Sequence, residues 1–157
     1  MTRLLLSDIM DLDVLEQEIL EGFVTSRSHP SAPLEILNYS NATQYAHHWT
    51  SVTRQTRGLI YDKQTLEVIA RPFEKFFNCD QVETPTPPRG AAMIRSPKMD
   101  GSLGVVFHNH YASRLEVATR GSFASEQAQH ATAWLHSYLQ KLRKYDQFAW
   151  LDTVERL

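Results

Sequence analysis

Apolar residues recur at helical spacing in two parts of this chain, and the first lies near the N-terminus. Leu12, Leu15 and Ile19 fall on one face of a predicted helix. Ser7 or Asp8 is the expected N-cap, because both side chains can accept hydrogen bonds from the first helical amides. Gly22 is the expected end of this helix.

A longer amphipathic helix is predicted over residues 125–145. Its apolar residues recur at three- and four-residue spacing: Ala131, Trp134, Leu135, Tyr138, Leu139 and Leu142. We expect Trp134, Tyr138 and the leucines to pack against the rest of the protein. Any part of this face that stays exposed would favour self-association.

Short runs of alternating or apolar residues between the two helices predict strands. Residues 34–39 form one predicted strand. Residues 59–61 and 66–70 form a predicted hairpin around the polar turn 62–65.

A proline-rich stretch, 85–90, separates these strands from a second group. Because proline fixes φ and lacks an amide hydrogen, this stretch is predicted to be a stiff connector between two sheets of one domain. Residues 91–95, 103–108 and 114–119 then predict an antiparallel meander. The fold class is therefore α+β, with mostly antiparallel sheets and flanking helices.

Composition indicates a folded protein whose charges are unevenly distributed. The 157 residues are 42% hydrophobic and 22% charged, which excludes a disordered chain. With a net charge of −2, attraction for nucleic acid must come from a local basic patch. Basic residues gather in the middle of the chain: Arg54, Arg57, Arg71, Lys75, Arg89, Arg95, Lys98, Arg114 and Arg120. This pattern suits an anionic ligand, and charge alone leaves a scattered solvated surface equally open.

The cysteine and hydropathy patterns indicate a cytoplasmic protein. Cys79 is the only cysteine, so an intrachain disulfide is excluded, and burial as a small apolar residue is expected. No apolar run reaches the roughly 20 residues of a membrane span. Acidic residues follow the first leucines at once, unlike in a signal peptide. We therefore expect no membrane partner.

The segment 98–104, Lys-Met-Asp-Gly-Ser-Leu-Gly, carries the strongest chemical signal. It places a lysine between two predicted strands. An amine attacks phosphorus only when unprotonated, and burial and neighbouring cations favour that form. Four basic residues are candidates for these cations: Arg57, Lys75, Arg95 and Arg120. The same cations would neutralise the charge of a phosphate during its transfer.

Two neighbours of Lys98 add to this signal. Asp100 can hold the lysine or a metal ion, and Gly101 lets backbone and nucleotide approach closely. A lysine followed by aspartate and glycine is also common in exposed turns. These residues alone leave both a catalytic lysine and a surface turn open.

Two further groups of residues have more than one interpretation. Phe73, Phe76 and Phe77 can stack on adenine or RNA bases, and at least two of them are expected in the core. His108 and His110, two positions apart, would share one face of a strand, where they could ligate zinc with Glu116 as a third ligand. No cysteine or histidine at ligand spacing completes that set, so we assign no metal ligand.

Segment 98–104 resembles motif I of the covalent nucleotidyltransferases, the polynucleotide ligases and mRNA capping enzymes. Three further blocks resemble the phage-type RNA ligase 1 branch, the tRNA-repair ligases: residues 56–61, 70–78 and 119–127. The blocks occur in the family's order and at similar spacing. Together with Tyr39 they cover most of the chain from about residue 36 to 130.

This resemblance implies an ATP-grasp-like ligase domain and a three-step reaction. Lys98 forms lysyl-N-AMP from ATP, with Mg²⁺ or Mn²⁺ as the metal ion, and releases pyrophosphate. The AMP passes to the 5′-phosphate of an RNA end, and a 3′-hydroxyl then displaces it to seal the strand. ATP and RNA ends, tRNA among them, are the implied partners.

The resemblance also implies roles for individual residues. Arg57 and Lys75 match basic residues that line the family's nucleotide and phosphate site, and Tyr39 matches an aromatic residue near it. Gly101 matches the motif I glycine, with Asp100 beside it. Arg120 stands where many relatives have lysine, so the charge is kept while the geometry of a phosphate contact differs.

The chain departs from the family pattern after the last predicted helix. The family's later motifs supply a carboxylate for the ribose, another for the metal and a lysine pair for the triphosphate, and the tail 147–157 stops about where they would begin. We therefore expect residues 1–157 to be the N-terminal portion of an adenylation domain that is incomplete and weakly active by itself.

Other functions remain open at this point. The chain can be a non-catalytic nucleotide- or RNA-binding remnant, or one half of a split ligase. A capping-type or DNA-ligase specificity is a further alternative, and the block 71–78 favours the RNA ligase branch instead.

Overall fold

The computed structural model describes residues 3–79, 81–92, 94–97 and 99–144. A four-stranded antiparallel sheet in the order β1-β2-β3-β4 packs against a two-stranded sheet, β5-β6. The strands of the two sheets are β1 (Val24–Ser28), β2 (Leu34–Tyr39), β3 (Arg57–Asp62), β4 (Val68–Ala70), β5 (Gly104–Asn109) and β6 (Arg114–Thr119). The helices are η1 (Leu6–Asp8), α1 (Leu12–Leu20), α2 (Asn41–Tyr45), α3 (Ser51–Gln55) and α4 (Glu126–Lys144).

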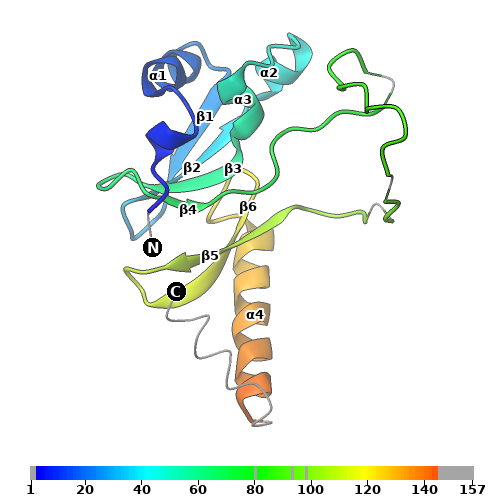
Figure 1. Ribbon diagram of the computed structural model, residues 1–157. Coiled ribbons are helices and arrows are strands. Elements are labelled where there is room, and N and C mark those ends of the chain that lie inside the picture. The colour runs from blue at the N-terminus through cyan, green and yellow to red at the C-terminus, as the bar shows by residue number, and fades with distance from the viewer. Residues whose placement is uncertain (1–2, 80, 93, 98, 145–157) are drawn as a thin grey trace.

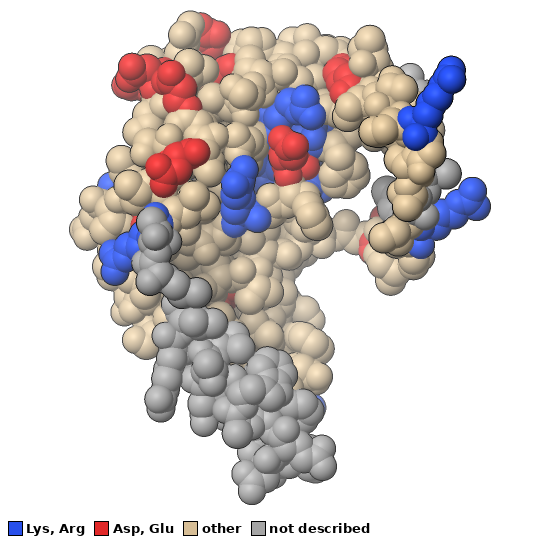
Figure 2. All heavy atoms as spheres, viewed as in Figure 1, with Lys and Arg blue, Asp and Glu red and all other residues tan. Residues whose placement is uncertain are grey.

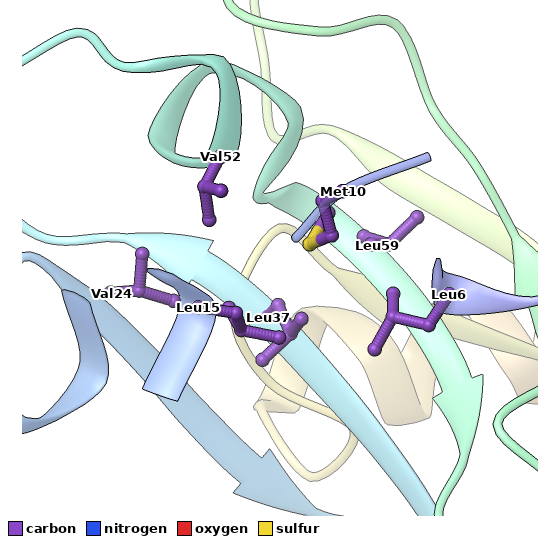
Figure 3. Packing of buried hydrophobic residues seen from close by; sticks show 7 residues of the cluster. All are labelled: Leu6, Met10, Leu15, Val24, Leu37, Val52 and Leu59. Carbon is purple, nitrogen blue, oxygen red and sulfur yellow. The ribbon is translucent and has the colours of Figure 1, made fainter. Parts of the chain in front are cut away.

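The central strands β2 and β3 are buried on both faces. Leu37 pairs with Leu59, and the next pair along, Ile36 with Ile60, points to the opposite face because side chains alternate along a strand. The first face packs under η1, α1 and α3 in a cluster that Figure 3 shows: Leu6, Met10, Leu15, Val24, Leu37, Val52 and Leu59. This double burial explains why residues 34–39 are apolar at successive positions.

The other face of the large sheet packs on the β5–β6 hairpin. The shared cluster consists of Leu34, Ile36, Ile60, Val105, Phe107 and Ala118. Figure 1 shows α1 and α3 on one side of the large sheet and the hairpin with α4 on the other. Two sheets that lie far apart in the sequence therefore form one packed body.

Helix α4 covers the edge of β6 that does not pair with β5. Thr132 Oγ1 accepts a hydrogen bond from the amide of Val117 at 2.9 Å and donates one to its carbonyl at 3.3 Å. His136 Nε2 donates to the carbonyl of Leu115 at 2.6 Å. These contacts satisfy backbone groups that an open strand edge would leave exposed.

Most predicted elements are confirmed. Strand 34–39 and strand 114–119 have the predicted bounds, and the 59–70 hairpin forms as β3 and β4. Helix 125–145 is observed as Glu126–Lys144, and residue 145 lies outside the described part of the chain.

The N-cap of the first helix was predicted wrongly. Asp11, and not Ser7 or Asp8, caps α1 by accepting from the amides of Asp13 at 2.9 Å and Val14 at 3.2 Å. Asp8 instead accepts from the amide of Leu5 at 2.8 Å and closes the preceding turn. Gly22 follows the helix with φ +81°, as expected for its end.

The predicted strand at 91–95 does not form. The described residues of this stretch have no regular structure, and Ile94 is 96% exposed. A strand needs a partner for its backbone groups and an apolar face to bury, and residues 91, 92, 94 and 95 have neither. This stretch lies with the proline-rich stretch 85–90 in the long segment between β4 and β5 that protrudes from the body (Figure 1).

Three further expectations about burial are wrong. Trp134 is 60% exposed and Tyr138 45%, and the two rings stack on each other with centroids 5.1 Å apart. Cys79 is exposed.

No helix among the described residues is long and apolar enough to cross a membrane.

Buried carboxylates connect the two sheets. Asp62 is fully buried at the end of β3, where Tyr111 Oη donates to it at 2.7 Å and His110 Nε2 lies 3.2 Å away. Glu116 on β6 lies 2.9 Å from His29 Nε2, which follows β1. Burial alone would raise the pKa of Asp62 and Glu116, but hydrogen bonds from their partners outweigh it and hold both pKa values below the usual range.

We expect the free energy of unfolding to fall steeply as the pH falls below about 4. A carboxyl group with a lowered pKa in the folded state contributes its full stabilisation above its unfolded pKa, and loses it as pH falls through the folded value. Denaturant unfolding of the wild type and of Asp62→Asn at pH 7, 5, 4 and 3 checks this. The free energy of unfolding should change less with pH in Asp62→Asn than in the wild type. In the exposed control Glu16→Gln it should change with pH as in the wild type. Equal slopes in all three proteins would contradict the assignment.

Candidate functional site

The site forms where the start of β3 passes close to the end of β6. Gly58 has φ +85°, and a Cβ atom there would lie 3.3 Å from the carbonyl oxygen of Arg120 and 3.3 Å from Val105 Cγ2. Because glycine adopts this conformation and leaves this space free, the backbones of Gly58 and Arg120 lie side by side. Arg57 and Arg120, which are 63 positions apart in the printed sequence, are thereby brought to the same edge.

Arg120 is held against the aromatic ring that ends β2. Its Nη1 donates to Tyr39 Oη at 3.0 Å, and its Cζ lies 4.9 Å from the centre of the ring. Tyr39 itself is 5% exposed, so its ring is a fixed support. This hydrogen bond and cation–π contact orient the guanidinium group.

Lys75 lies in an aromatic box next to this pair. Its Nζ is 4.7 Å from the centre of the Phe77 ring and 5.3 Å from that of Trp49. Trp49 makes edge-to-face contacts with both Tyr39 and Phe77, at centroid distances of 5.0 and 5.4 Å. The amide of Lys75 donates to the carbonyl of Arg54 at 2.7 Å, which fixes the segment to α3.

Neighbouring positive charges affect the ionisation of Lys75. Burial lowers the pKa of Lys75, and the positive charges of Arg57 and Arg120 lower it further, against an opposing effect of Glu83. A group of cations that repel one another in this way is a strong attractor for a polyvalent anion. Figure 2 shows Lys and Arg side chains together in the middle of one face and others on the protruding segment.

Two hollows meet at Arg57. The first, here called the basic hollow, has a volume of about 550 Å³. It is lined by Thr25, Arg27, Asn38, Arg57, Gly101, Ser102, Leu103, Thr119, Arg120, Gly121 and Ser122. The second, the Phe73 groove, has about 520 Å³ and is lined by Gln55, Arg57, Arg71, Pro72, Phe73, Glu74 and Leu103. Arg57 and Leu103 line both and divide one from the other.

The structure brings together several residues that the sequence singled out. Tyr39, Lys75 and Arg120 are within one network of contacts, and the charge of Arg57 acts on Lys75. Gly101, with φ +134°, lines the basic hollow beside two of the arginines.

Other predicted residues are not placed in the network. Asp100 is exposed, and its Oδ1 accepts from the amide of Gly101 at 3.0 Å. Arg95 is exposed on the protruding segment. Lys98 lies outside the described residues, so its proposed role rests on the sequence.

Sequence reasoning did not assign Trp49 or Arg27 to this region, and named Arg54 only as one of the basic residues in the middle of the chain. Trp49 and Arg54 contact the Phe77 ring, and Arg27 reaches the basic hollow from β1. No periodic pattern singles out Trp49, because it lies between the short helices α2 and α3. Only its contacts with Tyr39, Phe77 and Lys75 identify it.

The zinc interpretation is not supported. Glu116 pairs with His29 and with Arg114 at 2.7 Å, while His110 lies next to Asp62. In the described ranges, no group of three or more His, Cys, Asp or Glu residues could hold a metal ion.

The donor set fits the phosphates of a nucleotide better than a divalent ion. The described lining of the basic hollow carries three arginines and no carboxylate. Guanidinium groups bind phosphate oxygens in a bidentate manner, whereas Mg²⁺ takes oxygen ligands from carboxylates, phosphates and water. The described residues can therefore hold the anion and do not by themselves form a site for the ion.

Comparison with known protein families identifies a related family. A family model described as RNA ligase, that of the phage T4 RNA ligase 1 family, matches residues 55–153, more than half of the chain. The matched range contains Arg57, Lys75, Lys98 and Arg120, and begins after Tyr39. None of the curated proteins matches the chain.

Proposed function

We propose, from the premise that this chain belongs to the phage T4 RNA ligase 1 family, that it takes part in ATP-dependent joining of RNA ends through an AMP intermediate on Lys98. The observation that carries the proposal is the convergence of three cations at one edge of the large sheet: Arg57 and Arg120 line one hollow, and Arg120 is linked to Lys75 through Tyr39 and Trp49. Arg57, Lys75 and Arg120 come from three separate blocks of the sequence. Gly101, which follows Lys98 by three positions, lines the basic hollow together with Arg57 and Arg120.

The first step would be attack by the unprotonated Nζ of Lys98 on the α-phosphorus of ATP. A nitrogen–phosphorus bond forms, the bond from phosphorus to the bridging oxygen breaks, and pyrophosphate leaves with the electron pair. An oxygen of the RNA 5′-phosphate then takes the adenylyl group from Lys98. Finally, a 3′-hydroxyl attacks that 5′-phosphate, loses its proton, and releases AMP.

The described residues contribute charge and orientation to these steps. Arg57 and Arg120 line the basic hollow, where they would bind phosphate oxygens and neutralise the charge that develops in transfer. Tyr39 keeps Arg120 oriented through its hydroxyl. A bound anion would relieve the repulsion that lowers the pKa of Lys75.

The proposal extends to the range of the domain. Residues 1–157 would form the N-terminal portion of the nucleotidyltransferase domain, with 85–90 as an internal connector. RNA ends, tRNA among them, would be the acceptors.

One observation favours a second candidate function. Because the described lining of the basic hollow has no carboxylate, the chain can bind nucleotide without transferring it, or transfer it only when another segment supplies the metal ligands. The alternative is thus a nucleotide- or RNA-binding protein, or one half of a split ligase.

Incubation with α-³²P-ATP and either Mg²⁺ or Mn²⁺ tests the proposal. We expect label on the 18.1 kDa chain after denaturing electrophoresis, stable in alkali and lost in acid, as a phosphoramidate bond requires. γ-Labelled ATP should leave no label, and labelled GTP measures the selectivity for the base. The proposal of AMP transfer would be overturned if no label appears with either ion, and if the label is still absent when a separate chain with the family's later motifs is added. Binding of ATP under those conditions would support the second candidate.

A further inference from the structure

At least two of Phe73, Phe76 and Phe77 were expected in the core, and this expectation is wrong because two of the rings are exposed. Phe73 is 86% exposed and Phe76 is 64% exposed, whereas Phe77 belongs to the aromatic box. Single exposed apolar residues are common on protein surfaces. Phe73 and Phe76 differ because both lie in the short segment 71–76, which also contains Arg71 and Lys75 and lies next to the candidate site.

The backbone that carries the rings is fixed. Arg57 Nη1 donates to the carbonyl of Phe73 at 3.3 Å, and its Cζ lies 5.1 Å from the centre of the Phe76 ring. Arg71 Nη2 donates to Gln55 Oε1 at 2.8 Å, which ties the start of the segment to α3. The segment is therefore attached to β3 and α3 while the Phe73 ring stays free on one side.

The Phe73 groove combines the two features that bind single-stranded nucleic acid. It has an exposed aromatic ring, on which a base of any identity can stack, and two arginines for the flanking phosphates. Glu74 is the one carboxylate in its lining. A base-paired strand keeps its bases stacked inside the duplex, so only an unpaired nucleotide can use the ring.

The position of the groove favours RNA over another occupant. The groove and the basic hollow share Arg57 and Leu103 as a common wall, so a ligand in one lies next to a ligand in the other. Cationic side chains next to an aromatic surface complement an anionic polymer with flat bases better than an apolar protein partner.

We propose that the Phe73 groove binds an unpaired nucleotide of single-stranded RNA, with its base stacked on Phe73 and its phosphate paired with Arg71. This inference rests on the proposed function, because it supplies the surface that would present an RNA end to the basic hollow. It assigns to Phe73 a role in holding RNA and no part in AMP transfer.

Anisotropy of a fluorescein-labelled oligouridylate, titrated with the intact chain in the absence of ATP, tests the inference. Phe73→Ala should weaken binding by about 5- to 100-fold, the effect of losing one base–aromatic stack. Phe73→Trp should keep the affinity, because the flat surface is retained. Tyr45→Ala removes a ring that is 81% exposed outside the groove and should leave the affinity unchanged.

Charge gives a second measurement. Arg71→Gln should weaken binding and reduce the slope of log K against log salt by about 0.7, one phosphate contact on a single strand. Arg89→Gln, an exposed arginine outside both hollows, should change the slope less. A duplex of the same length should show no dependence on Phe73.

Several results would overturn the inference: no binding of the oligouridylate, equal effects of Phe73→Ala and Tyr45→Ala, or equal Phe73 dependence for duplex and single strand. Sedimentation of both variants identifies the alternative in which the groove binds a second copy of this chain. Because the titration contains no ATP, failure of AMP transfer leaves its result intact. The exposure of Phe73 means that its replacement should not alter thermal unfolding, which serves as the folding control.

Discussion

Replacing Lys98 with alanine is expected to remove the AMP label from the chain entirely. The proposed intermediate is a bond from Nζ of Lys98 to phosphorus, and alanine offers no nucleophile in its place. Loss of a nucleophile from a covalent mechanism lowers rates by far more than a thousandfold, so labelling should fall below about 0.1% of wild type. The measurement is the α-³²P-ATP incubation with equal amounts of folded protein.

Two matched variants separate nucleophile from charge. Lys98→Arg keeps a positive charge that does not deprotonate, so it should also remain unlabelled. Lys141→Ala removes an exposed lysine from α4 and should label like the wild type. Label that persists on Lys98→Ala would show that another residue is the acceptor, and mapping of the labelled peptide would identify it.

ATP binding should survive the loss of Lys98. The groups expected to hold the phosphates are Arg57 and Arg120, which remain in place. Nucleotide binding measured by calorimetry should therefore change little in Lys98→Ala while transfer is lost. Parallel loss of binding and transfer would mean that the lysine holds the nucleotide and does not attack it.

Gly58→Ala is expected to destabilise the fold by about 2–4 kcal/mol, which is a large part of the stability of a small domain. Two causes add. The φ of +85° costs an L-residue roughly 1–2 kcal/mol. The added Cβ would also lie 3.3 Å from the carbonyl oxygen of Arg120 and 3.4 Å from its Cα, and these backbone atoms cannot rotate away.

Gly22→Ala is the matched control for this prediction. Gly22 has φ +81°, almost the same backbone conformation, but a Cβ there would meet nothing within 4 Å. Its replacement should cost only the backbone term, about 1–2 kcal/mol. The midpoint of denaturant unfolding, at unchanged m-value, gives both numbers. Equal losses of unfolding free energy in the two variants would show that the close contact of Gly58 with Arg120 does not add to the cost of the substitution.

The same substitution should affect the site. Moving the backbone of Arg120 away from Gly58 displaces its guanidinium from Tyr39, with which it shares a 3.0 Å hydrogen bond. We therefore expect Gly58→Ala to weaken ATP binding even at temperatures where it stays folded. Gly22→Ala, which ends α1 away from the site, should bind ATP like the wild type.

Local patterns were sufficient for the regular elements with a clear periodicity. The strand 34–39 and helix α4 were predicted nearly to the residue, because their apolar spacing admits one interpretation. The first N-cap was missed because Asp8 and Asp11 are equally good capping residues in sequence. Which of them caps α1 depends on the turn that Asp8 closes with Leu5.

Burial was the weaker part of the prediction. Residues 91–95 have apolar side chains suited to a strand, but no strand pairs with them among the described residues, and Ile94 faces solvent. Phe73 and Trp134 are large apolar residues that a pattern assigns to the core, yet both are exposed. Composition indicates that a residue prefers burial and cannot say whether another element is available to cover it.

The four ordered blocks already identified the RNA ligase family and selected Arg57, Lys75, Lys98 and Arg120. Residue type, order and spacing are properties of the sequence itself, so no structure was needed for this step. How Arg57 and Arg120 meet depends on the packing of two sheets that are far apart in sequence. The close approach at Gly58 and the support of Arg120 by Tyr39 arise there, whereas the box around Lys75 forms where the segment after β4 packs against Trp49 and α3. Such contacts join residues separated by tens of positions, so no local pattern encodes them. They exist only once the chain has packed and, for Arg57 and Arg120, once the start of β3 lies against the end of β6.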